Sequence, residues 1–292
     1  MKKLLGFVLK SFCWLIYHLP LKLRFFMGDI LGILWFDIFR IRRQVVIDNI
    51  SRVFPEMTEK NKVVLGRWSL RNMGRNLIEY CYLPFMSKSL VERFFRFEGE
   101  HYVQEALSQG KGVCFLTLHL GSGDLACSAL SVKGYPVHLI SKIFKVKWLN
   151  DLWFGMREKV GTKFIAPRNS SYHILKALKK NEIVIFVMDQ FTGPPIGVRT
   201  KFFGYETGTG FGLALMAQRS GAPVIPIYTI RQLDGTHVIR IQPPIPFEDS
   251  DDRDESLAQM TQVYNDYLEK FVLECPEQWM WVHKRWKIFR EN

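Results

Sequence analysis

The chain has 292 residues, of which 48% are hydrophobic, 14% aromatic and 23% charged. This composition excludes a disordered, collagen-like or low-complexity chain, and the length lies between that of one large domain and that of two. The formal net charge of +12 predicts a polyanionic partner: nucleic acid, an acidic membrane surface, or a phosphorylated or otherwise anionic substrate. Composition alone does not choose among the three.

Two apolar stretches, residues 4–19 and 25–39, lie near the N-terminus. Lys2 and Lys3 precede the first stretch, but no small-residue cleavage site follows it, which argues against a removable signal peptide. Eight cations and three acids give residues 1–50 a net charge of +5. Apolar helices bordered by cations suit an anionic bilayer surface, so we expect residues 1–45 to form membrane-associated helices. Lys10 leaves open whether the first helix spans the bilayer or lies in its interface.

The five cysteines are odd in number and scattered along the chain. They form no C-x-x-C pair, and no Cys/His group has zinc spacing, so we expect neither a metal site nor a cofactor. Reduced thiols are typical of the cytosol or of the cytosolic face of a membrane.

From about residue 97 onward, short apolar runs alternate with helix-compatible stretches. The predicted strands cover residues 113–118, 136–140, 183–188, 223–230 and 237–241. This pattern predicts an α/β domain over residues 46–292, with a central, mainly parallel mixed sheet flanked by helices. An Asp-Gly between the last two strands predicts a hairpin and therefore an antiparallel edge. The acidic run 248–255 predicts a solvated loop before a helix over residues 256–274.

The most informative segment is HLGSGD, residues 119–124, directly after the strand predicted at 113–118. Ligands bind at the carboxyl ends of strands in open α/β sheets. We expect Asp124 to hold one ring nitrogen of His119, which leaves the other nitrogen as a general base. Gly121 and the following helix N-terminus would bring backbone N–H groups to a developing oxyanion. These groups suit acyl transfer to a hydroxyl; the alternative is a helix cap at Asp124 and a polar strand end at His119.

Several stretches resemble the bacterial lipid A biosynthesis (lauroyl/myristoyl) acyltransferases of the lysophospholipid acyltransferase superfamily. LTLHLGSGD (116–124) matches the H-x4-D/E signature of that superfamily. Residues 187–228 contain Asp-Gln, Phe-Phe-Gly and Gly-Ala-Pro-Val, while PEQWMWVHKRWK (276–287) is long and specific. With NISRVFPEM (49–57), the similarity spans nearly the whole chain and implies a glycerolipid acyltransferase-like fold.

The resemblance implies transfer of a fatty acyl chain from acyl carrier protein to a hydroxyl of a glycolipid precursor at the cytoplasmic face of the bacterial inner membrane. In that scheme His119 is the base, Asp124 orients it, and donors near Gly121 hold the oxyanion together with a nearby cation. This sequence has Gly123-Asp124 where many lipid A acyltransferases have a large aromatic before a glutamate. Acyl transfer is therefore the firmer expectation, and the acceptor stays open between a lipid A precursor and another phospho- or aminolipid.

Four further residues are candidates for substrate binding. Arg168 has the planar fork that suits an acceptor phosphate or an oxyanion, against the alternative of a solvated loop arginine. Asp189 and Gln190 follow the strand predicted at 183–188, and we expect them to hydrogen-bond sugar hydroxyls. Phe203 is expected to shape the acyl pocket, although aromatics here are as often plain core.

The remaining cations suggest where partners bind. Residues 140–180 hold ten cations against two acids, and we expect this surface to dock an acidic acyl carrier protein. Tryptophans among cations at 279–287 are typical of a membrane interface, so nucleic acid is not the expected partner. Two other functions stay open: a lipid or thioester hydrolase with the same dyad, and a non-catalytic basic binding protein.

Overall fold

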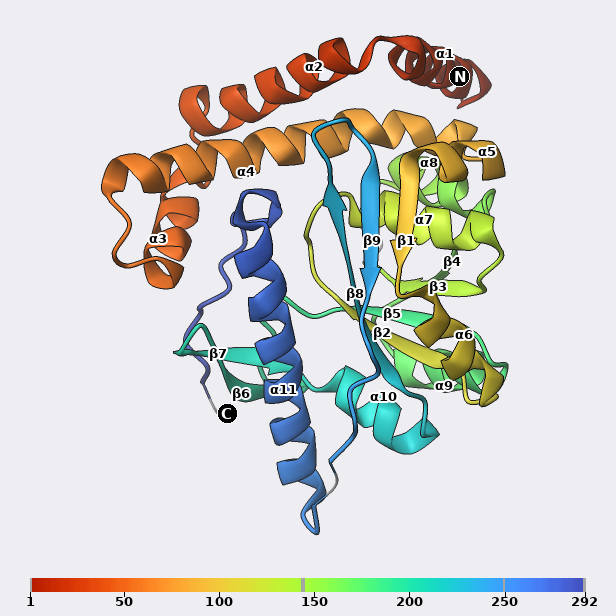
Figure 1. Cartoon of the computed structure of the whole chain (residues 1–292), viewed down its shortest axis with the longest axis vertical. Helices are drawn as coiled ribbons and strands as arrows, with labels where there is room; N and C mark the ends of the chain where they lie inside the picture. The colour runs from red at the N-terminus through yellow and green to blue at the C-terminus, as the bar shows by residue number, and fades with distance from the viewer. Residues whose placement is uncertain (1, 143–144, 249, 291–292) are drawn as a thin grey trace.

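The computed structural model, which describes residues 2–142, 145–248 and 250–290, is built around a seven-stranded sheet (Figure 1). The strand order is β1-β9-β8-β2-β5-β3-β4, and every neighbouring pair is parallel except β8 and β9. The strands are β1 (Phe95–Glu98), β2 (Val113–Thr117), β3 (Val137–Ile140), β4 (Lys163–Ile165), β5 (Ile183–Val187), β8 (Val224–Arg231) and β9 (His237–Ile241). The prediction of an α/β domain with a mainly parallel sheet is confirmed.

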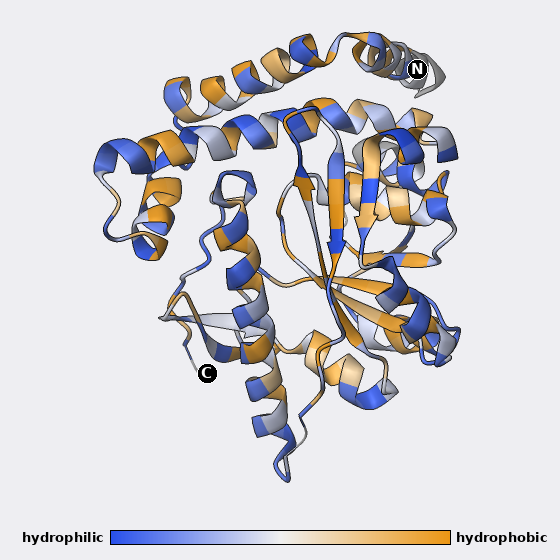
Figure 2. Ribbon diagram, viewed as in Figure 1, coloured by the Kyte–Doolittle hydropathy of each residue, from blue (hydrophilic) through white to orange (hydrophobic). Residues whose placement is uncertain are grey.

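The strands at the centre of the sheet are buried on both faces, which explains their continuous apolar sequences (Figure 2). One face packs against α9 (Ser170–Lys179), α10 (Gly212–Ser220) and α11 (Arg253–Glu274). The other packs against α5 (Lys88–Phe94), α6 (Glu100–Ser108), α7 (Gly123–Lys133) and α8 (Lys147–Glu158). These two layers leave the carboxyl ends of β2 and β5 accessible beside the start of α7.

Some elements differ from the prediction. The β8–β9 hairpin is present, but β9 is not the edge, because β1 pairs with it in parallel. The four residues of β1 are too short a run for a sequence signal. A separate hairpin of β6 (Gly197–Phe202) and β7 (Tyr205–Gly210) was not expected, since it is rich in Gly and Thr rather than in apolar residues.

Helix α11 begins at Arg253, inside the acidic run that we expected to form a loop. The Asp252 carboxylate accepts the backbone N–H groups of Asp254 at 2.8 Å and Glu255 at 3.3 Å. Because of this N-cap, the helix begins before residue 256, where the apolar pattern predicted its start. Asp249, in the same run, lies outside the described residues.

The N-terminal third is a helical layer of α1 (Lys2–His18), α2 (Leu21–Ile33), the π-helical turn η1 (Leu34–Ile38), α3 (Arg43–Val53), α4 (Glu59–Glu79) and the 3-10 turn η2 (Tyr80–Phe85). Helix α2 runs along α4 (Figure 1). A Cβ atom on Gly74 would lie 2.1 Å from the Gly28 carbonyl oxygen, so the two backbones touch. Asp29, which interrupts the apolar sequence, pairs with Arg71 and with Arg75, whose Nε lies 2.7 Å away.

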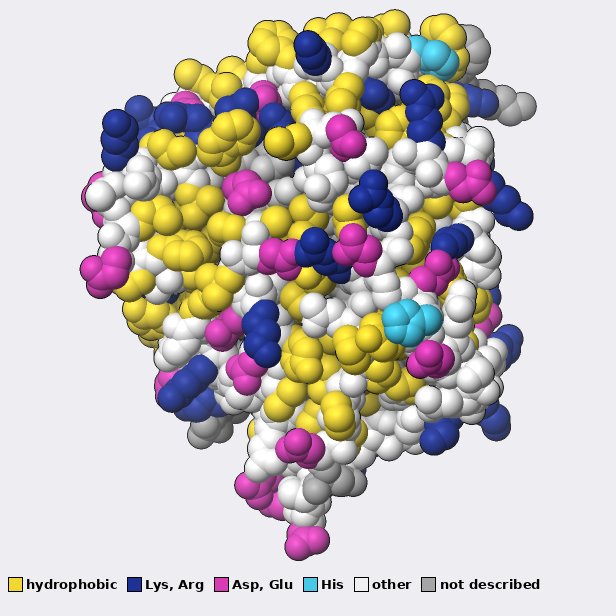
Figure 3. Space-filling view, in the orientation of Figure 1, with side chains coloured by type: hydrophobic (Ala, Val, Ile, Leu, Met, Phe, Trp, Pro, Cys, Tyr) yellow, Lys and Arg dark blue, Asp and Glu magenta, His cyan; other side chains and the backbone are white. Residues whose placement is uncertain are grey.

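The outer side of this layer is apolar (Figure 3, top). The exposed apolar side chains of α1 and α2 include Phe12, Trp14, Leu15, Leu23, Phe26 and Ile30. None of the helices described in the structure is both long and apolar enough to cross a bilayer. The side chains of Lys2 and Lys3, counted in the charge of this segment, lie outside the described residues. The domain boundary at residue 45 stays a prediction.

Candidate active site

His119, the histidine singled out by the sequence, lies at the carboxyl end of β2. Its partner follows β5, the neighbouring strand in the sheet. His119 Nδ1 lies 2.8 Å from Asp189 Oδ1, and the His119 backbone N–H donates to Asp189 Oδ2 at 3.1 Å. The register pairs Thr117 with Val187, so residues two positions beyond the ends of β2 and β5 meet. Parallel pairing therefore builds the His–Asp contact.

Asp189 is 2% exposed, and a third donor, Trp279 Nε1, lies 2.8 Å from its Oδ2. Burial by itself would raise the Asp189 pKa, but the charge of His119 and these hydrogen bonds lower it to about 2. Burial likewise would lower the His119 pKa, and the charges of Asp189 and Asp124 with the Asp189 hydrogen bond raise it overall. The ring is 40% exposed, so an ionised carboxylate holds one edge of an imidazole whose other edge is accessible.

Asp124 does not hydrogen-bond His119 in the described structure, contrary to our expectation. Its Oδ1 lies 3.1 Å from Arg157 Nη2, and its Oδ2 accepts the Tyr80 hydroxyl at 3.0 Å. Burial and the Asp124 charge raise the Tyr80 pKa, which keeps that hydroxyl a donor. The guanidinium of Arg157 is fully buried, 3.8 Å from the Trp153 ring centroid. In the described structure, Asp124 therefore influences His119 through its charge.

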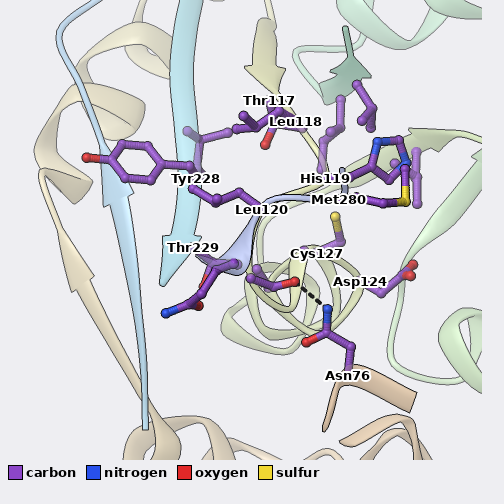
Figure 4. A pocket seen from close by; sticks show the side chains of 18 of the residues that line it. Asn76, Thr117, Leu118, His119, Leu120, Asp124, Cys127, Tyr228, Thr229 and Met280 are labelled. Atoms are coloured by element: carbon purple, nitrogen blue, oxygen red, sulfur yellow. Dashed lines mark hydrogen bonds between the residues drawn. The ribbon is translucent and has the colours of Figure 1, made fainter. Parts of the chain in front are cut away.

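Gly121 forms the turn between His119 and α7, with φ of +56°. A Cβ atom there would lie 2.3 Å from the Thr229 carbonyl oxygen, so no larger residue fits. Its carbonyl accepts Asn76 Nδ2 at 2.7 Å (Figure 4), and its N–H donates to the Gln278 carbonyl at 3.1 Å. That N–H is thus not free for a substrate oxygen. The donors left at this position are the first-turn N–H groups of α7, which have no partner within the helix.

A cavity of about 400 Å³ opens beside His119 and Asp124, a size typical of small-molecule sites (Figure 4). Its inner part, between α7 and the sheet, is apolar and is lined by Ala126, Cys127, Leu130, Leu139, Ile185, Val187 and Ile227. Burial raises the pKa of Cys127 to about 12, so this thiol stays protonated. Trp35, Met73 and Leu77 of the N-terminal layer line another part of the wall. The site therefore joins a His–Asp pair to a slot suited to a hydrocarbon chain.

One known protein family matches nearly the whole chain. Residues 2–288 match the family model described as bacterial lipid A biosynthesis acyltransferase. The chain belongs to this family.

Three known proteins are similar to this chain over most of its length. The lipid A biosynthesis lauroyltransferase of Escherichia coli (strain K12) is 28% identical over 96% of this chain and 90% of that protein. The palmitoleoyltransferase of the same strain is 26% identical, over 94% and 88%. A phosphatidylinositol mannoside acyltransferase of Mycobacterium tuberculosis (strain CDC 1551 / Oshkosh) is 23% identical, over 75% and 69%. The crystal structure of a 1-acyl-sn-glycerophosphate acyltransferase from Thermotoga maritima matches with 12% identity and a TM-score of 0.39, over 87% of this chain and 98% of that one.

Three residues that we expected at the acyltransferase site lie elsewhere. Arg168 is exposed in the turn after β4 and is not among the residues lining the cavity; the buried Arg157 contacts Asp124 instead. Phe203 occupies the β6–β7 turn with φ of +51°, also outside the cavity wall. Gln190 is also not among the residues lining the cavity, and its backbone carbonyl accepts a hydrogen bond from Arg285 Nη1 at 3.4 Å. In the sequence, Arg157 was only one of the ten cations in residues 140–180, and nothing there indicated its contact with Asp124.

The C-terminal segment of the family signature is core, so the membrane-interface prediction for it is wrong. Trp279 and Trp281 are 2% and 0% exposed. The Met280 N–H donates to the His119 carbonyl at 3.1 Å, while Trp279 supports Asp189. Arg285, also buried, binds the Gly208 carbonyl at 2.7 Å, which burial of a cation requires. The C-terminal segment thus holds both members of the His–Asp pair by hydrogen bonds.

Proposed function

We propose that this acyltransferase moves a fatty acyl chain from acyl carrier protein, or another acyl thioester, to a hydroxyl of a lipid A precursor or related glycolipid. The site of action would be the cytoplasmic face of the bacterial inner membrane. The observation that carries the proposal is the His119–Asp189 pair at the mouth of an apolar cavity. An apolar slot beside a general base is what transfer of a hydrocarbon chain to a hydroxyl requires.

In the proposed reaction, His119 Nε2 accepts the proton of the acceptor hydroxyl as that oxygen attacks the thioester carbonyl carbon. Asp189 on Nδ1 fixes the tautomer with a free Nε2 and stabilises the imidazolium that forms. The first-turn N–H groups of α7 would bind the oxyanion of the tetrahedral intermediate. Its collapse breaks the C–S bond, and the imidazolium returns the proton to the departing thiolate.

The donor would approach the β4 edge of the sheet. Nine of the ten cations in residues 140–180 are exposed there: Lys142, Lys145, Lys147, Lys159, Lys163, Arg168, Lys176, Lys179 and Lys180. They extend over α8 and α9, which both contact β4. A positive surface attracts an acidic carrier over a long range, and salt would weaken the attraction. The apolar outer side of α1 and α2 suits contact with the bilayer, where the glycolipid acceptor resides.

The decisive test uses the purified protein with acyl carrier protein loaded with a fatty acid and a lipid A precursor, and follows the acylated lipid by mass spectrometry. We expect His119→Ala to abolish the product, and His101→Ala, at an exposed site on α6, to leave it unchanged. Retained acylation by His119→Ala would refute the base assignment. Release of free fatty acid without acylated lipid would identify a hydrolase.

A different acceptor is the second candidate. The similarity to a phosphatidylinositol mannoside acyltransferase favours a phosphoglycolipid other than lipid A, and Gly123-Asp124 departs from the usual lipid A pattern. Lipid mass spectrometry of cells that carry the wild-type or the His119→Ala protein separates the two. The lipid that loses an acyl group in the variant cells is the acceptor.

A further inference from the structure

A second cavity, of about 470 Å³, lies at the corner between α1 and α2. It is lined by residues 17–21 of the turn between these helices, Arg24 of α2, Arg93 and Phe94 of α5, and Asp234 of the β8–β9 turn. Nothing in the proposed reaction uses this cavity. It shares no lining residue with the active-site cavity.

The cavity has two arginines and a single carboxylate in its wall. Arg24 is only 8% exposed, its Nη1 donates to the Tyr82 hydroxyl, and its Nε is buried with no hydrogen-bond partner. Within the described residues, neither Arg24 nor Arg93 forms an ion pair. A desolvated guanidinium without an anion is unfavourable, so an anion entering here would gain both charge and hydrogen bonds.

The other polar groups of the wall already form hydrogen bonds within the chain. His18 Nδ1 lies 2.8 Å from the Trp14 carbonyl oxygen, so this nitrogen carries its hydrogen and donates it to that carbonyl. Asp234 already accepts the Thr236 N–H at 2.9 Å and the Thr236 hydroxyl at 2.7 Å. Two arginines against one carboxylate leave the lining net positive.

We propose that this cavity binds a phosphate ester, supplied by the headgroup of an anionic lipid. Arginine forks match phosphate oxygens, which explains the class of ligand. The lipid source follows from the surroundings, because Trp14, Leu15 and Leu23 on the same two helices are 54%, 54% and 42% exposed. A headgroup in the cavity would leave its acyl chains beside these side chains.

An occupant would be connected to the active site through the turn η2. Arg24 contacts Tyr82 of η2, and Tyr80 of the same turn lines the active-site cavity and binds Asp124. A lipid held at Arg24 would therefore bind a residue that contacts the turn carrying Tyr80. The binding proposal itself does not depend on the catalytic role of His119.

The test compares Arg24→Gln and Arg93→Gln with Lys22→Gln, which removes an exposed cation of α2 outside the cavity. The chain of residues 1–292 is titrated with phosphatidylcholine vesicles that contain phosphatidylglycerol or an equal charge of oleate. Its thermal unfolding is measured separately at increasing concentrations of inorganic phosphate. We expect each arginine variant to weaken phosphatidylglycerol binding about tenfold, as for loss of a charge-assisted hydrogen bond. We expect Lys22→Gln to change it less than threefold, and oleate vesicles not to distinguish the variants.

The outcomes assign the source. Arginine dependence with vesicles alone supports a lipid headgroup, and a stabilisation by inorganic phosphate that is lost in the arginine variants supports a phosphate site open to soluble anions as well. An equal loss in all three variants, or no loss in either arginine variant, overturns the proposal. Should Arg24→Gln fail to fold, Arg93→Gln decides, because its side chain is exposed and contributes little to the core.

Discussion

His119 and Asp189 are 70 positions apart in the chain, yet Nδ1 of one lies 2.8 Å from Oδ1 of the other. Their contact leaves Asp124, only five residues from His119, to pair with Arg157. Two carboxylates therefore act on one histidine in different ways. Asp189 holds it by a hydrogen bond, and Asp124 contributes charge alone.

Asp189→Asn tests the first of these roles. We expect kcat to fall by about 10²–10⁴, the range for loss of an orienting carboxylate or of general-base catalysis. His119 works as a base only when neutral, and Asp189 raises its pKa, so the substitution lowers that pKa. The acidic limb of the pH profile of kcat/KM then moves to lower pH. Asp124→Asn should move it the same way by less, and an unmoved limb in Asp189→Asn would contradict the pairing.

Arg157→Gln and Arg168→Gln separate the buried arginine from the exposed one. Removing Arg157 leaves Asp124 without its counter-ion, and we expect a loss of roughly 2–3 kcal/mol in the free energy of unfolding, below the value for a fully buried pair because Asp124 is 26% exposed. Arg168→Gln should change stability by less than about 0.5 kcal/mol. Denaturant unfolding measures the stability of both variants, and an acyl transfer assay measures their activity. If Arg168→Gln had a larger effect than Arg157→Gln on either measurement, the substrate-binding role that the sequence predicted for Arg168 would be restored.

The positions of the strands could be predicted from sequence, but the pairing across them could not. The apolar runs located β2 and β5, and both His119 and Asp189 were correctly placed at strand ends. The H-x4-D spacing drew attention to Asp124, whereas the true partner follows from which strands are neighbours and in what register. Strand order depends on packing between distant segments, and a single sequence does not contain it in readable form.

The burial of polar and aromatic side chains could not be predicted from the sequence either. Trp279 stands among cations in sequence, as a membrane-interface residue would, yet it is buried beneath Asp189. The difference lies in Arg285, whose charge is satisfied by the Gly208 carbonyl and by Thr209 of β7, a strand with no apolar pattern. An unpredicted hairpin thus decided whether the C-terminal segment faces lipid or core.

Ala126→Leu tests the apolar part of the active-site cavity as the acyl slot. The added branch would displace methylene groups of the bound chain, each worth about 0.8 kcal/mol when buried. We expect kcat/KM for a donor two methylenes longer to fall about tenfold relative to the shorter donor. Phe203→Leu, outside the cavity wall, is the control and should leave the preference unchanged. Competition between acyl thioesters, read by product mass, makes the comparison, and a shifted preference in the control alone would place the slot at β6–β7.

Trp279→Phe removes the indole N–H that donates to Asp189 while keeping an aromatic ring in the core. A hydrogen bond to a charged group contributes about 1.5–3 kcal/mol, and part of this stabilises the His119–Asp189 pair, so we expect kcat to fall at least about tenfold. The matched control is Trp286→Phe, which loses an indole hydrogen bond to the Phe202 carbonyl, away from Asp189. If Trp279 acts through Asp189, its variant lowers kcat with an unchanged KM for the acceptor and shifts the pH profile, and the control does neither. Equal losses of activity and of thermal stability in both variants would show that Trp279 only fills the core.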